Sequence, residues 1–449
     1  MGRMYSTVPT LQFSRVTAGT VGKGAASCAL TSEVRSSTTP TPARHCSLQT
    51  DVAVIGGGAS GCAAAVRLRQ RGLRVVVLDR ERGSPSRFCG EFLSGEARGS
   101  LDALRVRQAI EAVQPIAVRR LAMHSPRGRT FQMPLDGGGY GLSRRELDAA
   151  LRRAVEAGGA DYREGAGVTA VEGSPAEGFH ISVGSERIRA RAVVGAWGKR
   201  SALDRTLDRP FLRRASPYVG VKMQYRRPAV DDVVRLFLFP GGYCGFINLD
   251  GDRGAVAVLA HAEVLRAAGG KPESLIAWIR SVNPALDRRI GDAEPIPDSV
   301  RAIAQTPLTP KESVSGGVFL TGDGAGMIAP FLGLGVTNAL ASGIDAADAI
   351  ASWLDGEREF QSAARHYSAR QRERLGLVQR GSFAISWLLC RSGLAEPVLQ
   401  LLENVPLAGR AIYHASRRRA SSAEGLGGAE AGTAVRGWRS VSRSSVLEE

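Results

Sequence analysis

The sequence contains few cysteines and histidines for its length. Six cysteines are spread over 449 residues, and no two of them form a CxxC pair. This scarcity excludes a disulfide framework and a motif of paired thiols for zinc or redox exchange, and it predicts a reducing compartment. The six histidines have no partner at metal-ligand spacing, and neither HExxH nor GxSxG occurs. We therefore expect no metal site and no serine hydrolase site.

Long hydrophobic runs are also missing. A transmembrane helix needs about 18 or more consecutive apolar residues, and the nearest run, residues 383–390, ends at Arg391. Residues 394–402 follow with an apolar helical face, which can pack internally or rest on a membrane surface. The sequence therefore predicts no membrane-spanning helix and leaves a peripheral membrane contact open.

Lysine is scarce as well, since only five of the 59 basic residues are lysine. The net charge is +16; residues 1–50 hold five basic residues and one acidic residue, and residues 415–449 hold six and four. The remaining charge is spread thinly, unlike the dense patch of a nucleic-acid-binding protein. We therefore expect no nucleic-acid partner. The one dense cluster, residues 417–419, is either a solvated surface or a contact with an anionic membrane.

The two ends of the chain are rich in small and polar residues. Residues 1–48 lack the apolar run of a secretory signal and contain a single acidic residue. We expect a disordered leader, which is either an organelle transit peptide or a translated extension before the true start. Residues 420–449 are expected to form a disordered tail. Unless the leader is a transit peptide, these features predict a cytoplasmic protein.

Between the ends, the pattern of apolar residues predicts an α/β protein. Residues 51–55 and 73–78 have the composition of strands and residues 59–71 that of a helix, which gives a β-α-β unit. Ser143 and Glu146 have the spacing of a capping box, and the helix that they start ends at Gly158.

A second sheet is predicted from strand-like alternation further along the chain. The segments are residues 179–194, 217–225, 233–239 and 253–259. From Ala339 to residue 416 the pattern is helical.

A glycine-rich motif follows the first strand. It is Gly56-Gly57-Gly58-Ala59-Ser60-Gly61, a GxGxxG that opens a helix as in dinucleotide-binding folds. Such glycines allow a tight turn, a close approach of the backbone to a pyrophosphate and close helix packing, while the helix N-terminus faces the negative charge. Asp79, at the end of the second strand, is placed to accept hydrogen bonds from a ribose. The predicted cofactor residues are Gly56, Gly58, Ala59, Ser60, Gly61, Asp79 and Arg80.

A second motif, far downstream, indicates a flavin. It runs from Thr321-Gly322-Asp323 through Pro330 to Gly333-Leu334-Gly335. With the first motif it resembles the FAD-binding segments of the para-hydroxybenzoate hydroxylase and geranylgeranyl reductase superfamily. The resemblance implies that Asp323 binds the ribityl and pyrophosphate part of FAD and that the later glycines bring a helix N-terminus to the flavin ring. The predicted cofactor residues here are Gly322, Asp323, Pro330, Gly333 and Gly335.

Two more segments are similar to this superfamily. Residues 142–148 resemble its "SRxxLD" helix start, whose first arginine, here Arg144, lies near FAD in relatives. Residues 195–201 stand in the place of its "GADGxxS" segment, with Trp197 where the family has aspartate. In hydroxylases that aspartate helps couple the binding of FAD and NAD(P)H, so Trp197 argues against direct use of nicotinamide. NAD(P)H stays one candidate for the electron donor.

Candidate catalytic residues come from two segments that are similar to geranylgeranyl reductases. Residues 87–93 resemble their cysteine-glycine segment, and residues 237–243 resemble their "WxFP" strand, with Phe237 in the place of the tryptophan. Cys89, Glu91 and Tyr243 are therefore candidates to donate a proton to a carbon that receives hydride. Cys244 is a further polar group, but a lone cysteine such as Cys89 or Cys244 is also a common buried hydrophobe.

These resemblances imply an α/β fold in which a Rossmann-type FAD-binding domain is interleaved with a β-rich substrate domain, as in para-hydroxybenzoate hydroxylase, followed by C-terminal helices. The predicted FAD-binding segments are residues 49–115, 138–214 and 306–375. The predicted substrate segments are residues 116–137 and 215–305, and the helical extension is residues 376–419.

We predict an FAD-dependent oxidoreductase, similar to geranylgeranyl reductases, that moves hydride through the flavin to or from a small apolar isoprenoid, quinone or polyketide-like substrate. Two alternatives share the same cofactor contacts. One is an FAD-dependent monooxygenase that hydroxylates an aromatic or lipidic substrate, and the other is a non-redox flavoprotein. The oligomeric state and the electron donor are left open.

Overall fold

The first glycine motif joins a buried strand to a buried helix. The structure, a computed structural model, describes residues 48–83, 87–389, 391 and 394–417. The predicted β-α-β unit is formed by β1 (Leu48–Ile55), α1 (Ala59–Gln70) and β2 (Val75–Asp79). β1 pairs in parallel with β2 on one side and with β9 (Glu186–Gly195) on the other. Its residues 52–55 are all buried, as is typical of a central strand in a parallel sheet.

The first sheet has eight strands, with β1 near its centre. The order is β15-β16-β9-β1-β2-β6, and β8 and β7 extend the sheet as antiparallel strands next to β9. The prediction that residues 179–194 belong to the second sheet is wrong, because residues 192–195 supply the run of buried positions that a strand beside β1 needs. The other strands are β6 (Asp161–Glu164), β7 (Val168–Ser174), β8 (Gly178–Val183), β15 (Val314–Ser315) and β16 (Val318–Leu320).

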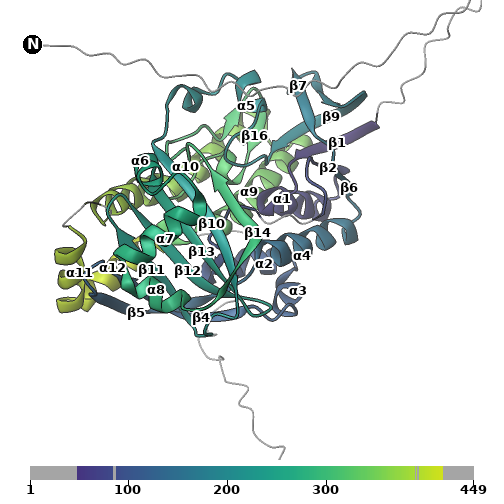
Figure 1. Cartoon of the computed structure of the whole chain (residues 1–449). Helices are drawn as coiled ribbons and strands as arrows, with labels where there is room; N and C mark the ends of the chain where they lie inside the picture. Colours follow the sequence, from purple (N-terminus) through teal and green to yellow (C-terminus); the bar gives the residue numbers. More distant parts are fainter. Residues whose placement is uncertain (1–47, 84–86, 390, 392–393, 418–449) are drawn as a thin grey trace, which may run out of the picture. The chain divides into compact units, whose positions relative to one another are not determined.

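Helices cover one face of the first sheet (Figure 1). α1, α4 (Arg144–Ala157) and α9 (Gly335–Leu354) share one core there, which includes Leu68, Leu151 and Ile350. Ser143 caps α4, since its hydroxyl accepts a hydrogen bond from the Glu146 N–H at 3.3 Å, as predicted. The shorter helices are α2 (Arg98–Ala103), α3 (Arg107–Glu111), α5 (Leu203–Thr206), η1 (Gly95–Ala97), η2 (Pro210–Arg213), η3 (Gly322–Gly324) and η4 (Pro330–Leu332).

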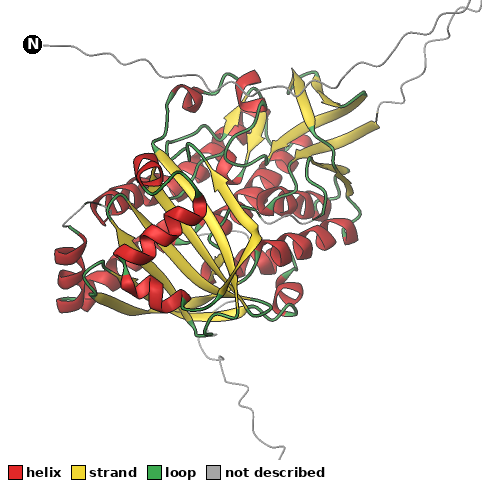
Figure 2. Ribbon diagram, viewed as in Figure 1, coloured by secondary structure: helices red, strands yellow, loops and turns green. Residues whose placement is uncertain are grey.

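A second eight-stranded sheet has the order β14-β10-β13-β12-β11-β4-β5-β3. Three helices lie on one of its faces (Figure 2), over a core that includes Phe237, Phe246 and Leu275. The strands are β3 (Phe92–Ser94), β4 (Ile116–His124), β5 (Thr130–Gly141), β10 (Tyr218–Arg226), β11 (Val233–Phe239), β12 (Gly242–Leu249), β13 (Arg253–His261) and β14 (Glu294–Ile303). The helices are α6 (Ala262–Ala267), α7 (Pro272–Val282) and α8 (Pro284–Ile290).

Three of the four predicted strand segments, now β10, β11 and β13, do lie in this second sheet. Sequence reasoning missed the other five strands of this sheet, β3, β4, β5, β12 and β14. β12 contains Gly242 and Gly245, and β14 contains Pro295 and Pro297. β14 is an edge strand, where a proline is tolerated because only one side of the strand is paired.

Helices follow one another from α9 to the end of the described chain, as predicted. They are α10 (Phe360–Leu389), α11 (Ala395–Asn404) and α12 (Pro406–Arg417). Among the described helices, none combines the length and the apolar composition needed to cross a bilayer. The predicted boundaries at 137/138 and 375/376 fall inside β5 and α10, and the domain division stays a prediction. The predicted leader, apart from Leu48, and the predicted tail lie outside the described residues.

Candidate cofactor and substrate site

The turn between β1 and α1 is made of glycines that lie against neighbouring backbone. Gly56 has a φ of 107°, and a Cβ atom there would lie 2.5 Å from the carbonyl oxygen of Ala196. A Cβ atom at Gly61 would collide with the carbonyl oxygen of Gly56. Ala59 and Ser60, both buried, begin α1. The tight turn and the close helix packing expected of the motif are present, while its binding role stays a prediction.

The N-terminus of α1 lies next to the Arg87 guanidinium, which also pairs with Asp79 and Asp148. Within the described residues 58–62, the helix has no side-chain cap at Gly58 and no acidic residue in its first turn. The Arg87 guanidinium reaches this turn, with Nη1 at 3.6 Å from the position that a Gly58 Cβ would take. A helix N-terminus next to a guanidinium fits an anion such as a pyrophosphate.

Asp79 lies at the end of β2 and is 3% exposed. Its Oδ2 pairs with Arg87 Nη2 at 2.7 Å and accepts a hydrogen bond from Tyr162 Oη at 3.2 Å. Its Oδ1 accepts one from the Glu81 N–H at 3.2 Å, and a carboxylate oxygen can accept a second bond, as from a ribose hydroxyl. Arg80 lies on the surface, 75% exposed, and pairs with Glu81 at 3.1 Å.

The second motif meets the first, although the two are far apart in sequence. A Cβ atom at Gly322 would lie 2.9 Å from Ser60 Oγ, and one at Gly343 would lie 3.0 Å from the Cβ of Ala63. The Gly322 N–H donates a hydrogen bond to Ser342 Oγ at 2.8 Å. The backbones of helices α1 and α9 therefore approach each other closely. The two motifs lie side by side, as expected if they hold one cofactor.

Two lysines lie around Asp323 in this second motif. Lys199 Nζ is 3.2 Å from Asp323 Oδ2, and Lys311 Nζ donates hydrogen bonds to the carbonyl oxygens of Lys199 and Asp323, each at 2.7 Å. Burial lowers the pKa of Lys311 to about 7, against the opposing effect of Asp323. Sequence reasoning missed both lysines as site residues, although the scarcity of lysine elsewhere was the available signal.

The end of the second motif opens helix α9. Gly335 is the first residue of the helix, is exposed, and has open space where a Cβ atom would stand. The first turn carries no acidic residue. A Cβ atom at Gly333 would lie 2.5 Å from Phe92 Cδ1, so β3 passes next to this turn. Open space before a helix N-terminus fits a ring that gains negative charge on reduction. Pro330, which begins η4, is exposed.

Glu91 lies in a buried cluster that joins the two sheets. It is 2% exposed and has a φ of 58°, a left-handed conformation that costs energy for a residue with a side chain. Its carboxylate pairs with Lys222 Nζ at 2.7 Å and accepts hydrogen bonds from Gln224 Nε2 at 2.9 Å and from the Arg144 N–H at 3.0 Å. The carboxylate is thus held by donors from β10 and from the start of α4.

Lys222 is the partner that sequence reasoning missed. It belongs to β10 and is fully buried, and its Nζ also donates a hydrogen bond to the carbonyl oxygen of Arg87 at 3.3 Å. A lysine in the middle of an otherwise apolar strand was the available signal, because such a residue is almost never buried without a partner. Its contacts fix the segment that carries Cys89.

Cys89 and Arg144 are neighbours in the same region. Cys89 is half-buried, and its Sγ accepts a hydrogen bond from the Glu91 N–H at 3.4 Å. The Arg144 side chain is 12% exposed, lies beside the thiol and pairs with Asp148 at 2.7 Å. Asp148 also pairs with Arg87 Nε at 3.1 Å. The predicted residue Arg144 is therefore tied to the guanidinium at the α1 turn through one shared carboxylate.

Tyr243 and Cys244 face opposite sides of the second sheet. Tyr243 is 3% exposed; its Oη accepts a hydrogen bond from the Phe331 N–H at 2.8 Å, and the two rings meet edge to face at 5.8 Å. Phe331 belongs to η4 of the second motif, so Tyr243 lies at the predicted cofactor site. Cys244 is buried in the core under α7 and α8, where burial raises the pKa of its thiol. Cys244 therefore packs as a hydrophobe.

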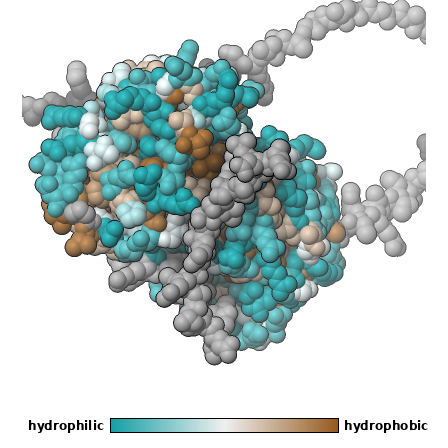
Figure 3. Space-filling model, turned by 90° about the horizontal axis from the view of Figure 1, so that it is seen from below, coloured by the Kyte–Doolittle hydropathy of each residue, from teal (hydrophilic) through white to brown (hydrophobic). Residues whose placement is uncertain are grey.

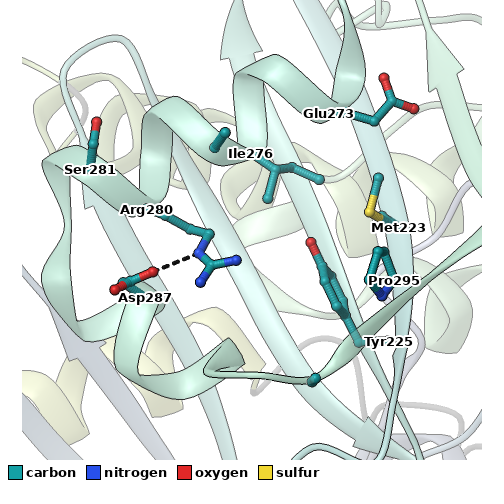
Figure 4. Close-up of a pocket in the computed structure, with 10 residues that line it drawn as sticks. Met223, Tyr225, Glu273, Ile276, Arg280, Ser281, Asp287 and Pro295 are labelled. Carbon is teal, nitrogen blue, oxygen red and sulfur yellow. Dashed lines mark hydrogen bonds and ion pairs between the residues drawn. The ribbon is translucent and has the colours of Figure 1, made fainter.

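A pocket of about 470 Å³ lies on the α7 side of the second sheet, away from these residues. Met223 and Tyr225 of β10 point into it in Figure 4, and Arg280 pairs with Asp287 at 2.6 Å across its rim. Side chains alternate along a strand, so Lys222 and Gln224 point to the other face, toward Glu91. This pocket does not belong to the site built by the two motifs.

Comparison with known families decides what this arrangement is. A model of the FAD binding domain family matches residues 49–380, which is most of the chain. The chain belongs to this family. FAD is therefore its cofactor, and the predictions of an FAD-dependent oxidoreductase and of the geranylgeranyl reductase and para-hydroxybenzoate hydroxylase superfamily are confirmed.

Curated relatives of this FAD-binding chain include two kinds of enzyme. A 1H-pyrrole-2-carbonyl-[peptidyl-carrier protein] brominase of Pseudoalteromonas luteoviolacea is 23% identical over 320 residues, 68% of this chain and 78% of that protein. Digeranylgeranylglycerophospholipid reductase 1 of Methanococcoides burtonii is 26% identical over 352 residues, 73% of this chain and 81% of that protein. This chain is similar to each of these two enzymes over most of its length.

Solved structures share the fold. The flavin-dependent brominase Bmp2 superposes with a TM-score of 0.70 at 19% identity, covering 83% of this chain and 93% of that one. A geranylgeranyl bacteriochlorophyll reductase-like protein from Thermoplasma acidophilum superposes with a TM-score of 0.66 at 21% identity, covering 83% and 96%. The predicted α/β fold with two sheets and C-terminal helices is confirmed.

The residues at the two motifs fit FAD. Two polar atoms at the second motif, Thr321 Oγ1 and Asn338 Oδ1, are buried and have no hydrogen-bond partner among the described residues, which fits a ligand that supplies one. Gly58, Arg87 and the N-terminus of α1 would hold the pyrophosphate, and Asp79 the ribose. Asp323 and the start of α9 would hold the ribityl chain and the ring side of FAD.

Proposed function

We propose that the protein is a reductase of the geranylgeranyl reductase type, which transfers hydride between its flavin and an apolar isoprenoid, quinone or polyketide-like substrate. One observation supports this most directly, namely the apolar cluster of the second sheet that packs against the second motif. Tyr243 shares a core cluster with Leu236, Leu238 and Leu259, and Phe92 and Phe331 pack against that cluster. The FAD supplies the hydride chemistry when it is bound.

The chain's own residues would bind the substrate and exclude water. Apolar side chains from the second sheet favour an apolar chain by about 25 cal/mol for each Å² that binding buries. In these apolar surroundings the Tyr243 hydroxyl is the first candidate to donate a proton to the substrate, and the Cys89 thiol is the second. Lys222 and Glu91 hold the segment of Cys89 in place, because Lys222 pairs with Glu91 and donates a hydrogen bond to the carbonyl oxygen of Arg87.

An oxygen-dependent reaction is the second candidate. It is favoured by the similarity to the brominase, which extends over 78% of that protein in sequence. Such an enzyme needs molecular oxygen, and a halogenase needs a halide as well. Side chains of the same apolar cluster would then bind an aromatic or lipidic substrate. NAD(P)H is a further proposal for the electron donor. Trp197 argues against its direct use, because Trp197 replaces an aspartate of the family motif.

The test is turnover with and without oxygen. The FAD-loaded protein is reduced under argon and mixed with a geranylgeranyl lipid or a quinone, and the product is weighed by mass spectrometry. We expect a product that has gained two hydrogen atoms, formed without oxygen. A product that forms only in air and carries an added oxygen or halogen atom supports the second candidate, and an unchanged mass supports a non-redox role.

The Tyr243→Phe variant tests the role of that hydroxyl. We expect slower product formation with an unchanged flavin spectrum, because the ring and its packing remain. Tyr225→Phe is the matched control, since Tyr225 is buried on the other face of the sheet. Equal effects of the two substitutions contradict proton donation by Tyr243.

A further inference from the structure

Exposed hydrophobic side chains are concentrated at one place on the molecule. Among the described residues, five large hydrophobic side chains are strongly exposed. One of them, Val230, is on the connection from β10 to β11. The other four are Leu401 on α11, Val405 between the helices, and Leu407 and Ile412 on α12, exposed by 58%, 44%, 74% and 47%. We call these four residues the α11–α12 apolar face.

Helix α12 exposes apolar side chains although it also packs on the protein. Its inner side consists of Gly409, Tyr413 and Arg417, spaced four residues apart. Arg417 is 8% exposed, pairs with Glu96 at 2.8 Å and lies over the Tyr413 ring at 3.8 Å. Leu407 and Ile412 point outward instead. A helix that only packs on a protein core places its apolar stripe inside and its charges outside. This outward face therefore suits an apolar environment.

The inner sides of the same two helices pack in the apolar cluster that contains Tyr243. Leu399 of α11 and Tyr413 of α12 belong to the core cluster that contains Tyr243. Phe331 of the second motif packs against that cluster. Apolar contacts therefore continue from the cofactor motif to the inner side of the helices whose outer side is the α11–α12 apolar face.

Basic side chains lie beside this face, and one of them, His414 of α12, pairs with Asp136 at 2.9 Å. Arg410 is exposed on α12, which has no acidic residue over residues 406–417. The acidic residues of α11 are turned toward the protein, where Glu396 and Glu403 pair with Arg129 at 3.5 and 3.2 Å. The sequence continues with two more arginines at positions 418 and 419, and the chain carries a net charge of +16. A second copy would meet the same positive charge, whereas an anionic bilayer offers the opposite sign.

We propose that the α11–α12 apolar face docks the protein on the surface of an anionic lipid bilayer. Leu401, Val405, Leu407 and Ile412 enter the interface, and Arg410 meets the lipid headgroups. Figure 3 shows the underside of the molecule as mostly hydrophilic, with hydrophobic areas near its centre and at the left edge; the left edge is the side on which Figure 1 shows α11 and α12. Resting on the proposed function, this docking would bring the enzyme to the bilayer in which an apolar substrate dissolves.

Vesicle flotation with the full FAD-loaded chain tests the docking. We expect the protein to float with vesicles of phosphatidylcholine and phosphatidylglycerol, and to bind phosphatidylcholine alone more weakly. The double variant L407S/I412S should bind at least about tenfold more weakly, because two apolar side chains no longer enter the interface. Both residues are exposed, so the variant should keep the thermal midpoint and the flavin spectrum of the wild type.

Val230→Ser is the matched control, because Val230 is equally exposed outside the α11–α12 apolar face. It should bind anionic vesicles like the wild type. The proposal is overturned if the wild type stays unbound, if L407S/I412S binds as well as V230S, or if light scattering shows a dimer that L407S/I412S splits. Turnover of a substrate without vesicle binding counts against docking alone, and vesicle binding without turnover counts against the proposed function alone.

Discussion

At the scale of single residues, Gly61 of the first glycine motif has no room for a methyl group. We predict that Gly61→Ala lowers FAD affinity by at least about tenfold, or 1.4 kcal/mol, because its Cβ would collide with the Gly56 carbonyl oxygen and displace the start of α1. Gly99→Ala is the control, since a Cβ there meets nothing within 4 Å. Titration of the apoprotein with FAD, followed by visible absorbance, measures both. Equal affinities of the two variants contradict the role of the motif.

The buried pair of Lys222 and Glu91 gives a stability prediction. Lys222→Met leaves the Glu91 carboxylate buried without its cation, which should lower the free energy of unfolding by about 3 to 5 kcal/mol. Glu91→Gln removes the carboxylate that pairs with Lys222 and should cost a similar amount. The double variant should recover most of the loss, because no unpaired charge remains. Urea unfolding of the four proteins measures this, and purely additive losses contradict a coupled pair.

Lys311 predicts a pH dependence of stability. Its pKa in the folded protein is about 7, below its ordinary value, because burial disfavours the charged form. Between pH 7 and the ordinary lysine pKa of about 10.4 the unfolded chain therefore binds more protons than the folded one, and stability rises with pH. The urea midpoint of the wild type should increase from pH 6.5 to 9 relative to Lys311→Met. Parallel curves for the two proteins contradict the lowered pKa.

The sequence located the tight glycine turn between β1 and α1 because local backbone geometry demands glycine at fixed spacing there. It did not identify Lys222, whose partner Glu91 lies 131 positions earlier on a different element. It favoured Cys89 over Cys244 as a candidate, but it did not show that the pleat of β12 turns Cys244 into the α7 and α8 core. Contacts made across sheets carry no local signature, so such residues are found only in the folded chain.

At the scale of elements, the N-terminus of α9 predicts an effect on the flavin. Gly335→Asp places a carboxylate in open space at the start of the helix and opposes its positive end. We expect the midpoint potential of the bound flavin to fall by about 10 to 20 mV, which corresponds to about 0.5 to 1 kcal/mol for a two-electron couple. Gly335→Asn is the uncharged control. Spectroelectrochemical titration measures the potential, and equal shifts in both variants contradict an electrostatic cause.

Strong local signals made some elements predictable. The β-α-β unit and α4 combine an apolar pattern with a glycine turn or a capping box, and both are found where the sequence places them. β12 and β14 contain glycines and prolines that break such patterns, and they are held by their neighbours in the sheet instead. The position of β9 next to β1 was missed because strand alternation alone does not say which sheet a strand joins.

At the scale of the whole molecule, the two sheets are joined at the site. Glu91 connects the segment before β3 to Lys222 of β10 and to the start of α4, and Tyr243 of β12 meets Phe331 of the second motif. Both connections come from the second sheet and reach residues next to the predicted FAD contacts. The cofactor and substrate sides are therefore built as one unit, and their residues are expected to affect binding and turnover together.

The central claim is that the two glycine motifs together bind FAD, and the visible spectrum of the purified chain tests it most directly. We predict a yellow protein that holds FAD in a molar amount equal to the chain, loses the colour on chemical reduction under argon, and loses the cofactor in the Gly61→Ala variant. A folded preparation that shows no flavin absorbance, even after incubation with excess FAD and removal of the unbound cofactor, would contradict the account.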